Sequence, residues 1–193
     1  MRSLCVFCGS STGSNPAFAD AARTVGASMA ARGLRLVYGG GNIGLMGIVA
    51  DAVLEAGGQV TGVIPRPMVE REIAHTGLTD LHIVETMHER KAMMAELSDG
   101  FVAMPGGFGT LEEIAEAITW TQLGVHEKPC GLLNVDGFYD GLLTFLAHAG
   151  ESGFIRPAGL AIVISNPDPA QLLDQLEAWT PAERRQWLRV GQT

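Results

Sequence analysis

The sequence has no cluster of basic residues. Lysine and arginine together number 13 against 21 acidic residues, and the net charge of the 193-residue chain is -8. Binding to duplex nucleic acid requires a basic face that neutralises phosphates, so we do not expect a nucleic acid as a partner. A local basic pocket can still bind a small anion.

Long apolar runs are also missing. No apolar segment approaches the ~20 residues that span a bilayer, and residues 4–7 are too short for the apolar core of a signal peptide. We therefore expect no membrane partner and a cytoplasmic location. The composition, with 47% hydrophobic and 18% charged residues, is that of an ordinary globular protein.

Cysteines are few, and no residues have the spacing of metal ligands. Cys5 and Cys8 form a C-x-x-C, but Cys5 lies in an apolar run typical of a strand, which favours buried free thiols over redox chemistry. Cys130 stands alone. The five histidines show no paired spacing. We expect neither a metal nor a cofactor.

Short apolar runs alternate with helical patterns along the whole chain. This alternation predicts an α/β fold, a Rossmann-like doubly wound parallel sheet in three layers, as one domain over residues 1–193 with a peripheral tail at 179–193. In such sheets ligands bind outside the carboxyl ends of the strands. The predicted strands are residues 4–7, 34–38, 59–64, 81–84, 100–104, 130–133 and 160–164.

A first glycine-rich turn follows the second predicted strand and opens a helix. It fits G-x-G-x-x-G and is a candidate phosphate loop, with its glycines at Gly39, Gly40, Gly41 and Gly44. No acidic residue stands about 20 positions later, which weakens a dinucleotide site, although Arg66 leaves an NADP site conceivable. A Walker A loop is excluded because Leu45 replaces its lysine. The alternative is a tight turn that only packs helix on strand.

A second glycine-rich turn, residues 105–110, leads into another helix. Thr110 fits a helix cap, and Glu113 stands three residues later as in a capping box, which is the structural alternative for Glu113. The apolar stripe of this helix is predicted as Leu111, Ile114, Ala115 and Ile118. Glu112, Glu113 and Glu116 lie off that stripe and place carboxylates at the mouth of the ligand crevice.

A basic pair, Arg90 and Lys91, begins a third helix. Arg90 shares a helical face with Met93, Met94 and Leu97, so it belongs to the inward-facing stripe. A charge there has a partner or a ligand, unless the arginine extends past the core edge into solvent.

The three motifs together resemble the Lonely Guy (LOG) family of cytokinin riboside 5′-monophosphate phosphoribohydrolases. Residues 105–113 match its P-G-G-x-G-T-x-x-E motif, residues 38–47 match Y-G-G-G-x-x-G-L-M-G, and residues 5–11 match C-V-F-C-G-S-S. The Arg-Lys pair after Met87-His88 matches as well, and the likeness covers roughly residues 3–165. The resemblance implies hydrolysis of the N-glycosidic bond of (N6-modified) adenosine 5′-monophosphates, releasing the free base and ribose 5-phosphate.

The resemblance also implies the site residues. Arg90 and Glu113 would be the catalytic pair. The substrate-binding set would be Glu72, Lys91, Gly107, Phe108, Gly109, Thr110, Leu111, Glu112 and Thr119. A homodimer is implied too.

Two other functions stay open at this stage. One is an NADP-dependent reductase, and the other is a nucleotide sensor or a protein similar to a molybdenum-cofactor carrier that binds without turnover. Many related sequences carry a lysine decarboxylase label. That label does not fit here, because only Lys91 and Lys128 exist and neither has a pyridoxal-binding context.

Overall fold

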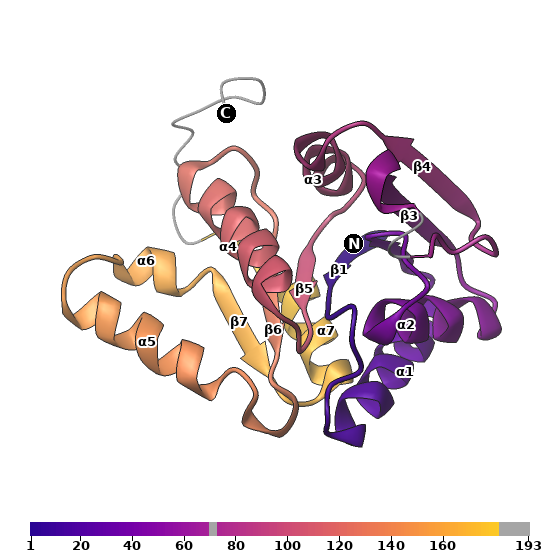
Figure 1. The fold of residues 1–193 in the computed structure, drawn as a ribbon. Coiled ribbons are helices and arrows are strands. Elements are labelled where there is room, and N and C mark those ends of the chain that lie inside the picture. Colours follow the sequence, from indigo (N-terminus) through magenta and orange to yellow (C-terminus); the bar gives the residue numbers. More distant parts are fainter. Residues whose placement is uncertain (70–72, 182–193) are drawn as a thin grey trace.

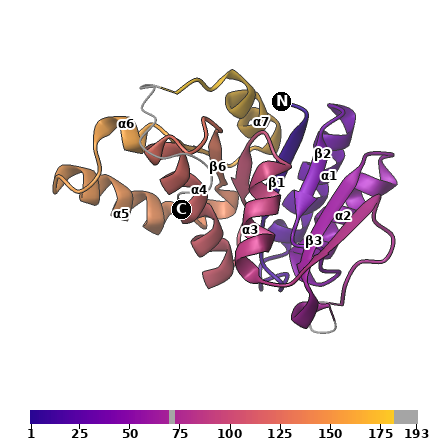
Figure 2. The ribbon, with the colours of Figure 1, turned by 90° about the horizontal axis from the view of Figure 1, so that it is seen from above.

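The structure, a computed structural model, describes residues 1–69 and 73–181 and has a parallel sheet between two layers of helices (Figures 1 and 2). The strands are β1 (Ser3–Phe7), β2 (Arg35–Tyr38), β3 (Val60–Pro65), β4 (Asp80–Val84), β5 (Phe101–Ala103), β6 (Cys130–Leu133) and β7 (Val163–Asn166). The α-helices are α1 (Pro16–Ala31), α2 (Gly44–Glu55), α3 (Met87–Glu96), α4 (Phe108–Leu123), α5 (Asp140–Glu151), α6 (Pro157–Leu160) and α7 (Pro169–Ala178). Two 3₁₀ turns, η1 (Arg66–Met68) and η2 (Val135–Gly137), complete the set.

The strand order is β4-β3-β2-β1-β5-β6-β7, with every pair parallel. The order reverses its direction between β1 and β5, so the loops that follow these two strands diverge to opposite sides and leave a crevice at their carboxyl ends. The predicted Rossmann-like, doubly wound parallel sheet is confirmed.

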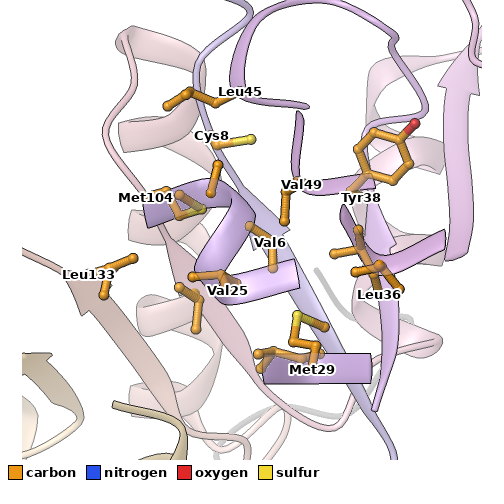
Figure 3. Close-up of a cluster of buried hydrophobic side chains, with 14 of the residues drawn as sticks. Val6, Cys8, Val25, Met29, Leu36, Tyr38, Leu45, Val49, Met104 and Leu133 are labelled. Atoms are coloured by element: carbon orange, nitrogen blue, oxygen red, sulfur yellow. The ribbon is translucent and has the colours of Figure 1, made fainter. Parts of the chain in front are cut away.

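Alternate side chains of β1 enter two separate cores. Leu4, Val6 and Cys8 pack with α1, α2 and α7 on one face, where Figure 3 shows Val6 among side chains from α1 and α2. Cys5 and Phe7 pack on the other face, beneath α3 and α4. Burial of one such apolar side chain contributes about 1.5–3 kcal/mol. All three cysteines are free and buried, as the sequence predicts.

The first helix begins and ends as the sequence predicts. Asn15 Oδ1 accepts a hydrogen bond from the Ala17 N–H at 3.0 Å, and Pro16 occupies the first helical position. Gly33 follows the helix with φ +68°, a left-handed conformation that glycine adopts at low cost.

The C-terminal part departs from the prediction in two ways. Residues 157–160 form the short helix α6 with Pro157 at its start, and this delays β7 to Val163–Asn166. The prediction also lacked α7, although Asp168 followed by Pro169 is a helix-start signal: Asp168 Oδ1 accepts from the Gln171 N–H at 2.8 Å. Most of the predicted peripheral tail, residues 182–193, lies outside the described residues.

Within residues 1–69 and 73–181, no helix combines the length and the apolar character that crossing a membrane requires.

The backbone at Gly44 permits a direct test of the crevice geometry. Gly44 has φ +58°, and an added Cβ would lie 2.3 Å from the Ser10 carbonyl carbon. Gly33 has a similar φ of +68°, but an added Cβ there meets no atom within 4 Å. We predict that Gly33→Ala lowers the free energy of unfolding by about 1 kcal/mol from backbone strain alone, and that Gly44→Ala lowers it at least twice as much. Urea denaturation of both variants measures this, and equal losses would contradict the close approach of Gly44 to Ser10.

Candidate active site

The loop after β1 joins the two glycine turns at the centre of the crevice. The Gly9 N–H donates to the Pro105 carbonyl at 3.0 Å, and the Gly9 carbonyl accepts from the Leu45 N–H, also at 3.0 Å. A Cβ added to Gly106 would lie 3.0 Å from the Gly9 nitrogen. The glycines therefore let three backbone segments meet at this edge, as predicted for the carboxyl ends of the strands.

Arg90 is buried on the inward face of α3, with 5% of its surface exposed. Its Nη2 donates to the Gly39 carbonyl at 3.2 Å, and a Cβ on Gly39 would lie 1.9 Å from that nitrogen. The alternative of an arginine that extends into solvent is excluded. Glycine at residue 39 leaves the space that the guanidinium occupies, so a larger residue there would displace Arg90.

Two thioether sulfurs flank the same guanidinium. Met68 Sδ and Met87 Sδ lie 3.8 and 3.7 Å from Nη1. Sulfur is a weak acceptor, so these two contacts pack against the guanidinium more than they compensate its positive charge. The predicted stripe of α3 holds for Arg90 and Met94 but not for Leu97, which is 38% exposed because the helix ends at Glu96 and Leu97 is its C-cap.

The first glycine turn is braced from its outer side by residues 73–77. The Asn42 N–H donates to the Ile73 carbonyl and the His75 N–H to the Gly40 carbonyl, both at 2.9 Å. The His75 ring accepts from the Gly77 N–H through Nδ1, so Nε2 carries a proton and donates to Asp51 at 2.9 Å. No local signal in the sequence indicates these contacts, because they join residues about 30 positions apart. They give the turn a structural task. Its role as a phosphate loop stays a prediction.

The second glycine turn opens α4 one turn earlier than predicted. Gly107 is the N-cap, and no side chain caps the helix. Thr110 lies inside the first turn and is 3% exposed, so its predicted role as the cap is wrong. The predicted capping box between Thr110 and Glu113 is therefore absent as well. Helix capping does not explain a glutamate at residue 113. An added Cβ at Gly107 or Gly109 meets no atom within 4 Å, so this helix start borders open space.

Glu113 lies on the side of α4 that faces the sheet. The buried positions of α4 are Thr110, Ile114 and Ala117, and Glu113 beside them is half-buried. The predicted stripe was displaced around the helix: Leu111 is 37% exposed and Ala115 is exposed as well. The prediction holds for Ile114, which is buried, and for Ile118, which packs against the core, but the inward face also includes Thr110, Glu113 and Ala117.

Both charged groups influence the buried thiol of Cys5 on β1. Burial raises the pKa of this thiol, the negative charge of Glu113 raises it further, and the positive charge of Arg90 acts in the opposite direction. The pKa of Cys8 is raised by burial and then by Glu113. Arg90 and Glu113, from two different helices, therefore both act on Cys5.

Lys91 is held between two carboxylates of α4. Its Nζ lies 2.6 Å from Glu112 Oε1 and 3.0 Å from Glu116 Oε1, and its side chain is 10% exposed. Burial lowers the pKa of Lys91, but the hydrogen bonds to Glu112 and Glu116 outweigh it and the pKa is raised. The predicted substrate contacts Lys91 and Glu112 thus bind each other in this chain. Glu116, which the resemblance did not include, binds Lys91 as well.

A narrow pocket lies below this ion pair, between α3 and α4. Lys91, Glu113 and Glu116 form its polar rim, and its apolar lining is Phe7, Ala95, Phe101, Ala117 and Trp120. The apolar lining reduces water around the three charged groups, which strengthens their interactions.

The remaining predicted substrate residues lie in different places. Phe108 is at the start of α4 and is 92% exposed. Thr119 is exposed, and its hydroxyl donates to the Ala115 carbonyl at 2.7 Å, so within one chain it does not join Arg90 and Glu113. Glu72 lies outside the described residues. In the part of the chain that the structure describes, no group of His, Cys, Asp and Glu side chains is arranged to hold a metal ion.

Solved structures with this fold include proteins of another kind. The molybdenum cofactor carrier protein of Chlamydomonas reinhardtii superposes with a TM-score of 0.71 and 24% identity, covering 92% of this chain and 99% of that one. A molybdenum cofactor binding protein of Rippkaea orientalis has a TM-score of 0.69 and 22% identity, covering 92% and 96%. Identity this low shows a common fold alone.

Sequence relatives are much nearer. The family described as "Possible lysine decarboxylase" matches residues 46–176. Cytokinin riboside 5′-monophosphate phosphoribohydrolase LOG5 of Arabidopsis thaliana is 52% identical over 180 residues, 93% of this chain and 79% of that protein. The probable enzyme of the same name, LOGL3 of Oryza sativa subsp. japonica, is 51% identical over 184 residues, 95% of this chain and 87% of that protein. Likeness of this extent shows that the chain belongs to the Lonely Guy family of cytokinin riboside 5′-monophosphate phosphoribohydrolases.

Proposed function

We propose that this chain hydrolyses the N-glycosidic bond of N6-modified adenosine 5′-monophosphates, releasing the free base and ribose 5-phosphate, with Arg90 and Glu113 as its catalytic residues. The observation that carries the assignment of residues is the arrangement at the crevice. A buried arginine from α3 lies against the first glycine turn, and a half-buried glutamate lies on α4, whose uncapped start borders open space.

Glu113 supplies the negative charge that the reaction needs. Cleavage of the bond between ribose and base builds positive, oxocarbenium-like charge on the ribose. A carboxylate beside the ribose stabilises this charge and can orient or deprotonate the attacking water. The position of Glu113 over an apolar lining increases the strength of this interaction.

Arg90 acts by charge and position. A guanidinium does not give up its proton at ordinary pH, so Arg90 is not a general acid. Its fork of N–H donors suits ribose hydroxyls or a phosphate. The contact of Nη2 with Gly39 fixes its direction before substrate arrives.

The 5′-phosphate binds at the start of α4 in this proposal. The first N–H groups of a helix have no partner inside the helix and attract an anion, and Gly107 supplies no side chain to satisfy them. The start of α2 is less available because the Leu45 N–H already donates to Gly9. Gly39, Gly40, Gly41 and Gly44 stay a candidate phosphate loop, and Gly39 and Gly44 also permit the close contacts with Arg90 and Ser10.

The environment of Lys91 argues against decarboxylation through a Schiff base on this residue, because that reaction requires a neutral amine. Lys91 is bound by two carboxylates that keep it protonated. Lys128 Nζ donates to the Ala95 carbonyl at 2.6 Å, where it satisfies the end of α3. The reductase and carrier alternatives are not favoured, because relatives near 50% identity are named as phosphoribohydrolases. The absence of a cofactor and the cytoplasmic location stay predictions.

A homodimer would cover the aromatic side chains that are exposed on α5 and just after it. Leu142 and Leu143 of α5 pack against the core beneath the helix. Phe145 of the same helix is 63% exposed, and Phe154, just after the helix, is 86% exposed. Large exposed apolar side chains are typical of protein interfaces, and we propose a second copy of this chain as the partner that covers them.

Sedimentation velocity tests the homodimer. The chain should sediment at twice its own mass, and Phe145→Glu should shift the population toward single chains because it places a charge in the apolar contact. Ile83→Glu is the matched control: Ile83 is also exposed, at 46%, but lies on β4 at the opposite edge of the sheet. Dissociation by Ile83→Glu and not by Phe145→Glu would locate the interface elsewhere.

The role of Glu113 is tested by Glu113→Gln, which keeps the size of the side chain and removes its charge. We predict that kcat falls on the order of 10²-fold or more while the fold and nucleotide binding persist. Circular dichroism and equilibrium binding of AMP serve as controls. A kcat equal to that of the unchanged protein would disprove the catalytic role.

The phosphate site is tested by comparing each nucleotide with its nucleoside. A charge-assisted hydrogen bond contributes roughly 1.5–3 kcal/mol, and the loss of two corresponds to ~10²-fold or more in kcat/KM. We predict that AMP and N6-isopentenyl-AMP are cleaved and that both nucleosides are barely cleaved, with part of the loss in kcat because phosphate binding positions the ribose. Equal kcat/KM for AMP and adenosine would show that the start of α4 does not hold the phosphate.

A further inference from the structure

The two catalytic side chains lie on separate helices, so their relative position depends on what joins those helices. Arg90 belongs to α3 and Glu113 to α4, and strand β5 separates these two helices in the sequence. Lys91, the neighbour of Arg90, makes a direct ionic contact between the two helices with Glu112 and Glu116, which lie on either side of Glu113 in the sequence.

The two carboxylates are not equivalent. The side chain of Glu112 is 55% exposed, whereas that of Glu116 is 27% exposed and lines the pocket together with Lys91 and Glu113. An exposed ion pair contributes little because water and salt screen it. The contact with Glu116 lies over Phe101 and Trp120, where screening is weaker, so it constrains the helices more strongly.

We propose that Glu116 is a positioning residue of the hydrolysis. It anchors Lys91 from the pocket side and thereby holds α3, with Arg90, in register against α4, with Glu113. Glu112, at the exposed end of the same ion pair, can then exchange its contact with Lys91 for one with substrate without release of the helices. This inference rests on the proposed catalytic roles of Arg90 and Glu113.

Substitution Glu116→Gln tests the proposal. Lys91 keeps Glu112 as a partner, so no buried charge is left uncompensated and the protein is expected to fold. Small displacements of reacting groups have large effects on rate, and we expect kcat for AMP to fall roughly tenfold with KM within about twofold. Unchanged kcat, or a rise in KM alone, would overturn the proposal.

A double-mutant cycle separates positioning from a general structural role. If Glu116 acts through Lys91, Glu116→Gln should lower kcat no further in the Lys91→Met background. If the two factors multiply instead, Glu116 acts independently of Lys91 and the proposal is wrong. Should Glu116→Gln not fold, Glu116→Asp retains the charge on a shorter side chain. A kcat equal to that of the unchanged protein would then be the contradicting result.

A matched control exists on the opposite face of the sheet. Arg32 is also held by two carboxylates of one helix, Asp174 at 2.6 Å and Glu177 at 3.5 Å, and this cluster joins α1 to α7 away from the crevice. Asp174→Asn removes one carboxylate and leaves the other, and kcat should not change. Glu113→Gln, measured in the same assay, distinguishes the two hypotheses. A fully active Glu113→Gln would refute the proposed catalytic roles. An inactive Glu113→Gln together with a fully active Glu116→Gln would refute the positioning role alone.

Discussion

The guanidinium of Arg90 lies against the backbone of Gly39, in space that any side chain at residue 39 would fill. β2 ends at Tyr38, directly before this contact. Residues 73–77 and the His75–Asp51 pair brace the turn from outside. The hydrogen bond to the Gly39 carbonyl holds the guanidinium in one orientation, which suits a group that stabilises charge in a reaction.

The second constraint is the rotation of α4 about its axis. The helix begins at Phe108, and Glu113 faces the sheet with Thr110, Ile114 and Ala117. A start at Leu111 with Thr110 as the cap would have left Glu113 a helix-start residue with a purely structural task. Thr110 instead lies on the buried face of the helix, and Glu113 lines the pocket together with its apolar residues.

The fold alone does not select this chemistry. Molybdenum cofactor carrier proteins superpose on nearly the whole chain at 24% identity. One fold of this kind can therefore be shared by proteins of different function. In this chain the difference lies in a few residues: a buried arginine, a half-buried glutamate, and the lysine and carboxylates that join their helices.

Much of this protein is determined by the sequence alone. The buried strand of residues 4–7, the Asn15 cap, Gly33 after α1 and the two glycine turns follow from local preferences, and the alternation of strand and helix leads to the parallel sheet. The motifs around Arg90 and Glu113 were enough to identify the family. These features are local, because each depends on a few neighbouring residues whose backbone preferences no distant contact reverses.

Only the tertiary structure decided which face of α4 is inward, that Gly39 makes room for Arg90, and that Lys91 is bound by Glu112 and Glu116. The sequence also did not reveal α7, whose three buried leucines gain stability only against α1 and the sheet. Each of these features depends on residues far apart in the chain. The free energy of burying or pairing a side chain depends on the neighbours that folding brings to it. The spacing of residues along a helix does not indicate which neighbours these are.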